Sequence, residues 1–192
     1  MRTRVLVALL AAVLVASACT GGSGAVDQNA GGQFRYVSAT AKGKLIPAAD
    51  RKVAGDVSGT LLAGGNYQLS QDRGNVVLLN FFASWCGPCK VESPQLDSLY
   101  QARKAQGFTL VGLDVKDPSK GQLRDFVQNK GLTYPIVVDE PGKTAIQLGD
   151  VPLAGLPASV LIDKQGRVAA VYPQEVFVKD LDPVLDALAK ET

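Results

Sequence analysis

VVLLNFFASWCGPCK, residues 76–90, is the stretch that decides the fold of this 192-residue chain. Six of the seven residues from Val76 to Phe82 are apolar. So continuous a run predicts a strand buried on both faces, at the centre of an α/β sheet. The strand leads into Cys86 and Cys89, at the start of a helix that we expect to run from about residue 87 to residue 106. A Cys-x-x-Cys pair at a strand-to-helix junction is typical of redox-active dithiols.

The place of the two thiols at a helix N-terminus indicates their chemistry. Unpaired backbone N–H groups and the helix dipole stabilise a thiolate there, so Cys86 is predicted to be the attacking residue. Cys89 follows one turn later, close enough to close a small disulfide ring and to resolve a mixed disulfide. We therefore predict thiol–disulfide exchange at this pair.

Two structural alternatives for the pair fit less well. A structural zinc site needs four ligands, but the chain has no histidine and one other cysteine, Cys19. A purely structural disulfide usually closes a longer loop and needs neither Trp85 before it nor Gly-Pro within it. We therefore expect a redox-active pair with no metal and no cofactor.

Composition bounds the remaining chemistry. The chain is 46% hydrophobic and 20% charged, which fits one domain with an appendage. Its net charge of +2 comes from Arg2 and Arg4, in a segment that we expect to be removed, and no basic stripe favours nucleic acid. Because histidine is absent, acid–base chemistry must come from carboxylates, lysines or the thiols themselves.

The first residues predict export and a lipid anchor. A basic start, Met1 to Arg4, precedes eleven apolar residues and then small residues followed by Cys19. This pattern predicts a signal peptide over residues 1–18, and the apolar stretch is too short to span a membrane comfortably. The junction resembles the bacterial lipoprotein cleavage box, although Ala16 stands where leucine is commonest, and a plain secretory signal is the alternative. We expect Cys19 to be lipidated at the extracytoplasmic face of the bacterial cytoplasmic membrane, with residues 19–33 as a flexible tether.

Apolar periodicity predicts the other elements of a domain over residues 34–192. An N-terminal β appendage is expected, with a strand at 34–37 and a hairpin whose strands, 61–62 and 67–69, flank a turn at 64–66. Further strands are predicted at residues 108–115, 135–139, 158–163 and 168–172, and helices at 117–130, at 143–148 and from about residue 180 onward. Pro183 is expected in the first turn of the last helix. The order β-α-β-α-β-α-β-β-α is that of a thioredoxin-like α/β fold with a central αβ insertion, at about residues 119–138.

The chain resembles the TlpA/ResA-like family of membrane-anchored, extracytoplasmic thiol–disulfide oxidoreductases, in the thioredoxin superfamily. The similarity runs from about Gly59 to the C-terminus. It includes the central insertion and rests on residues 73–81, 83–90, Glu92, Pro94 and 155–163. The resemblance implies the thioredoxin-like fold and a dithiol site at Cys86 and Cys89.

The resemblance also assigns substrate-binding positions. Pro157 matches the family's cis-proline, at the start of a strand that faces the disulfide. A cis bond there leaves the main chain of Leu156 free to pair with a bound substrate strand. Trp85 is expected to shield and orient the thiolate.

Two further positions concern the proton of the resolving thiol. Asn80 stands where cytoplasmic thioredoxins keep a buried aspartate, and asparagine cannot take a proton. Glu92 matches the family's active-site glutamate, one helical turn after Cys89, and would accept or return that proton. Desolvation beside apolar neighbours should raise the pKa of Glu92, whereas a solvated helix glutamate is the structural alternative.

The leading functional hypothesis is reduction of disulfides in extracytoplasmic proteins. The resemblance implies the haem-attachment cysteines of apocytochrome c as substrate, with electrons from a membrane thiol transporter. The Gly87-Pro88 dipeptide, as in reducing cytoplasmic thioredoxins, favours this direction, and an oxidase that inserts disulfides is the alternative. A thiol peroxidase lacks support because the threonine-rich loop with a lone cysteine is missing. A copper carrier lacks extra ligands, since the chain has no histidine and no methionine beyond Met1.

Overall fold

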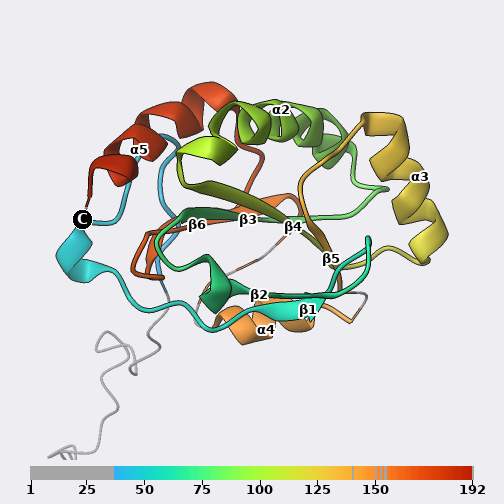
Figure 1. Cartoon of the computed structure of the whole chain (residues 1–192), viewed down its shortest axis with the longest axis horizontal. Helices are drawn as coiled ribbons and strands as arrows, with labels where there is room; N and C mark the ends of the chain where they lie inside the picture. Colours follow the sequence, from blue (N-terminus) through green and yellow to red (C-terminus); the bar gives the residue numbers. More distant parts are fainter. Residues whose placement is uncertain (1–36, 140, 150, 152, 154, 192) are drawn as a thin grey trace, which may run out of the picture. The chain divides into compact units, whose positions relative to one another are not determined.

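The centre of the fold is a five-stranded sheet in the order β5-β4-β3-β6-β7. Figure 1 shows it in the computed structural model, which describes residues 37–139, 141–149, 151, 153 and 155–191. The strands are β3 (Val76–Phe82), β4 (Phe108–Asp114), β5 (Ile136–Val138), β6 (Ala158–Ile162) and β7 (Val168–Tyr172). β3 pairs in parallel with β4 and antiparallel with β6, and all of its residues are buried. The predicted buried central strand is confirmed.

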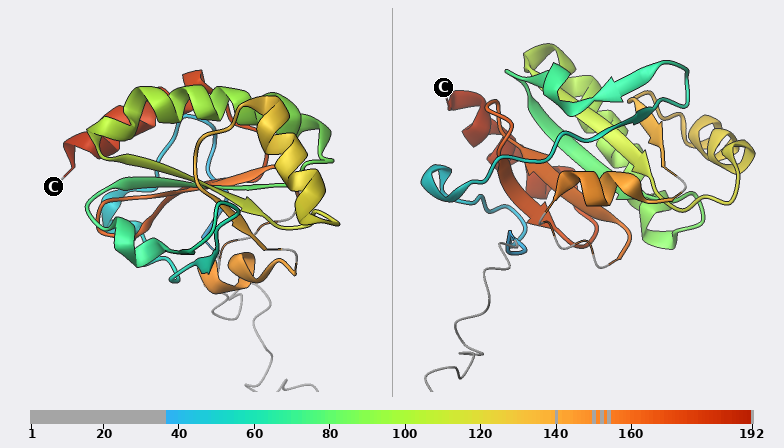
Figure 2. Two further views of the ribbon diagram at one scale, coloured as in Figure 1. Left: turned by 45° about the vertical axis from the view of Figure 1, so that its right-hand side comes forward. Right: turned by 90° about the horizontal axis from the view of Figure 1, so that it is seen from below.

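Helices cover both faces of the sheet and make two separate cores. The helices are α2 (Gly87–Arg103), α3 (Lys120–Lys130), α4 (Lys143–Leu148) and α5 (Val178–Lys190). Leu78 and Phe82 of β3 pack with α2, α3 and α5, whereas Leu79 and Phe81 pack toward α4. Figures 1 and 2 show the same division, with α4 alone among these helices below the sheet. The predicted element order, with its central insertion, is confirmed.

Two helices begin and end close to the predicted positions for identifiable reasons. Cys86 is the N-cap of α2, and a short 3₁₀ turn, η3 (Lys104–Gln106), extends the helix to Gly107. Gly107 adopts a φ of 77°, a left-handed conformation that glycine adopts without strain, and so ends the helix. Ser119 caps α3 by accepting a hydrogen bond from the Gln122 N–H at 3.3 Å.

The last helix starts near the predicted position, but the predicted place of Pro183 in its first turn is wrong. α5 begins at Val178, so Pro183 lies in its second turn instead of its first. Asp180 is inside the helix, where its carboxylate accepts a hydrogen bond from the Phe177 N–H at 3.0 Å and caps the terminus from within. The helix tolerates its internal proline because four leucine and valine side chains bury a continuous stripe against the sheet: Leu181, Val184, Leu185 and Leu188.

The N-terminal appendage is a hairpin, but its first strand is shifted. β1 (Ser58–Thr60) pairs antiparallel with β2 (Asn66–Gln68), and two 3₁₀ turns, η1 (Ala48–Asp50) and η2 (Leu69–Asp72), flank the hairpin. Leu61 and Leu62, predicted to form the first strand, instead pair with the edge strand β5, where the Leu62 N–H donates to Ile136 O at 2.8 Å. Of the strand predicted at 34–37, Val37 is not in a strand and the rest lies outside the described residues.

The segment before the hairpin runs along the other edge of the sheet. Thr40 N–H donates to Val171 O at 2.7 Å, Ile46 N–H donates to Ala169 O at 2.8 Å, and Val168 N–H donates to Lys52 O at 2.8 Å. The buried guanidinium of Arg51 fastens this segment to the domain through Asp163, at 3.2 Å, and Glu191, at 2.9 Å. Residues 37–57 are therefore part of the folded domain.

The predicted signal peptide, Cys19 and the tether lie outside the described residues. Among the helices that the structure describes, none has the length and apolar character needed to cross a membrane.

Candidate active site

The two cysteines form a disulfide at the start of α2. Their Cα atoms lie 5.2 Å apart, and the Cys89 N–H donates to Cys86 Sγ at 3.3 Å. Cys86 retains 5% exposure, whereas Cys89 is completely buried. An incoming thiolate can therefore reach only Cys86, which agrees with the predicted order of attacking and resolving thiols.

Glu92 lies one turn along the helix and is completely buried. Its Oε2 accepts a hydrogen bond from Asn80 Nδ2 at 3.0 Å, and its Oε1 accepts one from the Val176 N–H at 2.7 Å. Desolvation raises the pKa of Glu92 to about 7, although both hydrogen bonds act in the opposite direction. The predicted rise is confirmed, and the alternative of a solvated helix glutamate is wrong.

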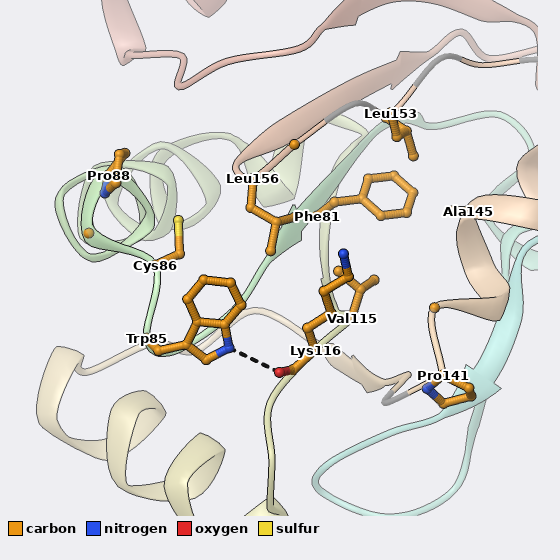
Figure 3. A pocket seen from close by; sticks show the side chains of 13 residues that line it. Phe81, Trp85, Cys86, Pro88, Val115, Lys116, Pro141, Ala145, Leu153 and Leu156 are labelled. Atoms are coloured by element: carbon orange, nitrogen blue, oxygen red, sulfur yellow. Dashed lines mark hydrogen bonds between the residues drawn. The ribbon is translucent and has the colours of Figure 1, made fainter.

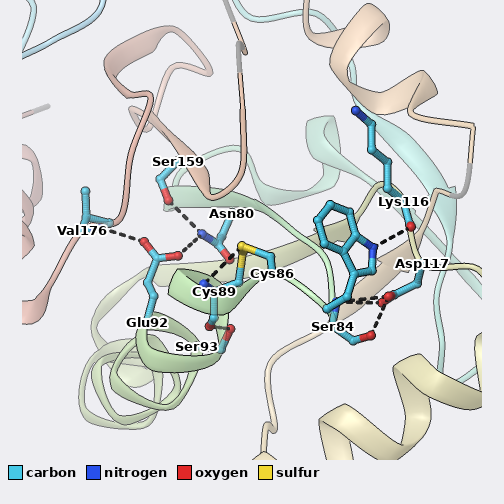
Figure 4. Close-up of a disulfide and its surroundings, with 11 residues drawn as sticks. Asn80, Ser84, Cys86, Cys89, Glu92, Ser93, Lys116, Asp117, Ser159 and Val176 are labelled. Carbon is cyan, nitrogen blue, oxygen red and sulfur yellow. Dashed lines mark hydrogen bonds between the residues drawn. A yellow bond between two sulfur atoms is a disulfide. The ribbon is translucent and has the colours of Figure 1, made fainter.

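Asn80 links Glu92 to the neighbouring strand. Its Nδ2 also donates to Ser159 Oγ at 3.0 Å, and Figure 4 shows Glu92, Asn80 and Ser159 as a row of polar groups beside the disulfide. Within the described part of the chain, Asn80 Oδ1 is buried without a hydrogen-bond partner. Sequence reasoning treated Asn80 only as a group that cannot take a proton and missed this bridging role. The signal was a single polar residue in an otherwise apolar strand.

The loop before β6 brings Leu156 and Pro157 to the site. The Leu156–Pro157 peptide bond is cis, as the resemblance implied. Phe81 of β3 is the partner of Ala158 in β6, so the residues before Ala158 continue beyond the end of β3 that leads to the cysteines. Leu156 is half-buried and Pro157 is buried.

A cavity of about 570 Å³ opens beside Cys86. Figure 3 shows Trp85 and Leu156 on either side of Cys86, with α4 at the far end. The lining is largely apolar and includes Phe81, Trp85, Val115, Ala145, Leu153 and Leu156, with Lys116 among them. Its size and apolar lining suit a side chain of a bound polypeptide next to a reacting disulfide.

Hydrogen bonds from the loop after β4 hold the residues just before Cys86. The Trp85 Nε1–H donates to Lys116 O at 2.9 Å. The Ser84 N–H donates to both oxygens of Asp117, at 3.1 and 3.0 Å, and its hydroxyl donates to Asp117 Oδ1 at 2.5 Å. Sequence reasoning missed Ser84 and used Asp117 only to open α3. The available signal was that β3 and β4 are parallel, so that the residues after them meet at one edge of the sheet.

No group of three or more histidine, cysteine, aspartate or glutamate side chains is arranged to hold a metal ion among the described residues.

This arrangement can perform thiol–disulfide exchange. In the reduced protein, the thiolate of Cys86 attacks one sulfur of a substrate disulfide, and the other substrate sulfur leaves as a thiolate. Cys89 then attacks Cys86 Sγ, which releases the second substrate sulfur. The protein ends as the Cys86–Cys89 disulfide, and the substrate has gained two electrons. Glu92, whose pKa of about 7 suits proton exchange near neutral pH, lies on the same helix face as Cys89.

The fold and the dithiol site define a thioredoxin-like thiol–disulfide oxidoreductase, and comparisons with known proteins agree. Residues 51–171 match the model of the AhpC/TSA family. The thiol–disulfide oxidoreductase ResA of Geobacillus kaustophilus is 34% identical over 129 residues, which cover 67% of this chain and 72% of the relative. This chain belongs to the AhpC/TSA family, and its resemblance to ResA is confirmed.

Two solved structures extend the comparison. A secreted thiol–disulfide isomerase from Corynebacterium glutamicum is 38% identical, with a TM-score of 0.72 over 77% of this chain and 91% of the other. A DsbF homologue from Corynebacterium diphtheriae is 36% identical, with a TM-score of 0.73 over 82% of this chain and 100% of the other. The predicted thioredoxin-like fold and the predicted thiol–disulfide oxidoreductase activity are confirmed.

Proposed function

We propose that this protein reduces disulfides in extracytoplasmic proteins, and that its substrates are the haem-attachment cysteines of apocytochrome c during cytochrome c maturation. The observation that carries the direction of electron flow is the buried carboxyl group of Glu92. The substrate follows from the resemblance to the TlpA/ResA-like family and from the similarity to ResA.

The charge beside the dithiol favours a reductant. A dithiol protein oxidises its partners strongly when its reduced form is stabilised. The hydrogen-bond donors of Glu92 are neutral, so its carboxylate is negatively charged above about pH 7 with no cation hydrogen-bonded to it. This charge repels a thiolate on Cys86, which makes the reduced form less stable and the protein a stronger reductant. The Gly87-Pro88 dipeptide favours the same direction.

The second candidate is an oxidase or isomerase of disulfides in secreted proteins. It is supported by the similarity to the secreted isomerase and to the DsbF homologue, which are 38% and 36% identical to this chain. The chemistry at Cys86 and Cys89 is the same in either direction, so only the reduction potential and the partner separate the two functions.

The reduction potential decides between these candidates. Equilibration of the Cys86–Cys89 pair with a glutathione or dithiothreitol buffer at neutral pH measures it. A reductant should lie near that of thioredoxin, about −270 mV, whereas a value near that of DsbA, about −120 mV, would overturn the proposal.

Trapping identifies the partner. With Cys89→Ser, the mixed disulfide on Cys86 should persist and can be identified by mass, and Cys86→Ser is the matched control that should trap nothing. Recovery of apocytochrome c supports the proposal, whereas recovery of secreted proteins with structural disulfides would favour the oxidase.

The proposal includes the extracytoplasmic face of the membrane as the site of action. Residues 1–18 would direct export, Cys19 would carry the lipid, and residues 19–33 would give the domain its reach. A membrane thiol transporter would return electrons to the oxidised pair. Cys19→Ala should release the protein from the membrane fraction while the exchange rate of the purified domain is unchanged. Retention in that fraction would point to an uncleaved signal.

A further inference from the structure

The loop after β4 holds the two residues before Cys86 through a buried carboxylate. Asp117 is 4% exposed, and Ser84 supplies three donor contacts to it, two from the N–H and one from the hydroxyl. Hydrogen bonds to an ionised acceptor are about twice as strong as neutral ones. The position of Ser84, and of the peptide that follows it, is therefore set by Asp117.

A second hydrogen bond joins the two neighbouring residues, Trp85 and Lys116. The Trp85 indole N–H donates to the carbonyl of Lys116, the residue before Asp117 (Figure 3). Figure 4 shows the first link, between Ser84 and Asp117. Trp85 is 56% exposed, so packing alone does not fix the orientation of its side chain. The hydrogen bond to Lys116, together with the fixed position of Ser84, holds the ring where it lines the cavity beside Cys86.

We propose that Asp117 is a positioning residue that acts through Ser84 and Trp85 on substrate binding. Val115 and Lys116 line the same cavity, so one loop supplies part of the wall and also orients the adjacent Trp85 ring. This inference rests on the proposed contact of substrate with Trp85 and Leu156, but not on the direction of electron flow or on the identity of the substrate.

The variant Asp117→Asn tests this role because it keeps the size of the side chain and removes its charge. Turnover is measured with dithiothreitol as electron donor and a synthetic peptide carrying an intramolecular disulfide as substrate. Because small displacements of positioning groups have large effects, we expect KM to rise roughly three- to tenfold and kcat to change less than about twofold. Hydroxyethyl disulfide is too small to contact the whole cavity lining. Asp117→Asn should therefore raise the KM for it less than the KM for the peptide.

Trp85 provides a direct readout because it is the single tryptophan of the chain. A looser ring in Asp117→Asn should lower the steady-state fluorescence anisotropy of Trp85. Ser84→Ala removes only the hydroxyl bond, so it should raise the KM for the peptide about two- to threefold, and it decides the question if Asp117→Asn does not fold.

Asp97→Asn is the matched control. Asp97 Oδ1 likewise accepts the N–H and the hydroxyl of one residue, Thr133, at 2.6 and 2.8 Å. It lies two turns beyond the cysteines on α2 and is not among the residues that line the cavity. This variant should lower the melting temperature while KM and Trp85 anisotropy are unchanged.

A double-mutant cycle with Trp85→Phe separates positioning from general stability. Once the indole is absent, Asp117→Asn should add little to the KM. The proposal is overturned if the two KM effects are fully additive, if Asp117→Asn lowers kcat alone, or if Asp97→Asn raises the KM equally. The reduction potential bears on the proposed direction of electron flow and not on this KM result, so failure of one leaves the other intact.

Discussion

Two buried carboxylates, Glu92 and Asp163, lie in the same domain with opposite surroundings. Their residues are 0% and 2% exposed. Asp163 forms ion pairs with Arg51, at 3.2 Å, and with Arg167, at 2.8 Å. The hydrogen-bond donors of Glu92 are a neutral amide and a backbone N–H. Asp163 follows the end of β6 that is remote from the disulfide, whereas Glu92 lies beside it.

The difference separates a structural carboxylate from a functional one. A buried charge with well-placed guanidinium partners holds segments together, as Asp163 holds residue 51 to the turn before β7. The carboxyl group of Glu92, which has no cation hydrogen-bonded to it, lowers the stability of the fold when it is ionised, because its pKa is raised to about 7. Site function, and not stability, explains the burial of Glu92.

The largest expected effect comes from removing the charge of Asp163. Asp163→Asn leaves the guanidinium of Arg51 buried with only the half-exposed Glu191 as an ionic partner, although the amide oxygen can still accept the N–H of Arg167. We expect the free energy of unfolding to fall by about 3–5 kcal/mol, measured by urea denaturation at pH 7. Glu191→Gln is the control and should show a smaller loss. A loss below about 1 kcal/mol for Asp163→Asn would contradict this assignment.

The second effect is a loss of stability with rising pH that depends on Glu92. Its pKa is raised from 4.5 to about 7, so the folded protein retains a proton that the unfolded chain has released between these values. The contribution of Glu92 to the free energy of unfolding is therefore largest below about pH 4.5. It falls by about 3 kcal/mol as the pH rises to 7 and is constant above that pH. Lys42 and Glu175 are the charged groups nearby, with opposite effects on this pKa.

Glu92→Gln should abolish this pH dependence. The oxidised variant should therefore be more stable than the unmodified protein at pH 8, the opposite sign to Asp163→Asn. The unpartnered Oδ1 of Asn80 is available to accept from the new amide if the Asn80 side chain turns over. The free energy of unfolding is measured by urea denaturation at several pH values from 4 to 8. If it falls with pH equally in both proteins, Glu92 is not the titrating group.

A smaller effect, of about tenfold, is expected on the rate at which mixed disulfides are resolved. Glu92→Gln removes the group predicted to accept the proton of Cys89, so the resolution of mixed disulfides should slow by about tenfold or more, the low end of general-base effects. The thiol of Cys86 should ionise at lower pH because a neighbouring negative charge is gone. Stopped-flow exchange and alkylation rates against pH measure the two quantities. If both are unchanged, Glu92 has no part in proton transfer.

The smallest effect is expected at Ser159. Ser159→Ala removes an acceptor of Asn80 Nδ2 but leaves the bond to Glu92, so stability should fall by about 1 kcal/mol. The pH midpoint of the Glu92 titration should move by less than in any variant of Asn80 itself. A larger shift for Ser159→Ala than for Asn80→Ala would mean that the serine, and not the asparagine, governs the carboxyl group.

Much of this fold follows from periodicity in the sequence. Continuous apolar runs identified β3, β4 and β6, because strands buried on both faces need no polar alternation. The hairpin of β1 and β2 was shifted because Leu61 and Leu62 pair with β5, a contact between residues far apart in sequence. Local turn signals carry no information on such pairing.

The residues of the site likewise divide into those that local sequence predicts and those that depend on contacts between distant residues. Cys86 and Cys89 follow from their spacing, and Glu92 follows from helical spacing together with the family resemblance. The complete burial of Glu92 could not be predicted, because it depends on Val176, in the loop before α5. Asp117 was missed for a similar reason, since its partner Ser84 is 33 residues away along the chain.

Both edges of the five-stranded sheet are already occupied by the protein's own chain. Residues 40–52 hydrogen-bond to β7, and Leu61 and Leu62 pair with β5. Within the part of the chain that the structure describes, neither edge therefore offers a free strand for strand addition, the usual way in which an extended peptide joins a sheet. We expect this closure to limit aggregation through strand pairing. It also fits the prediction that a substrate strand binds at the backbone before Pro157, next to Cys86.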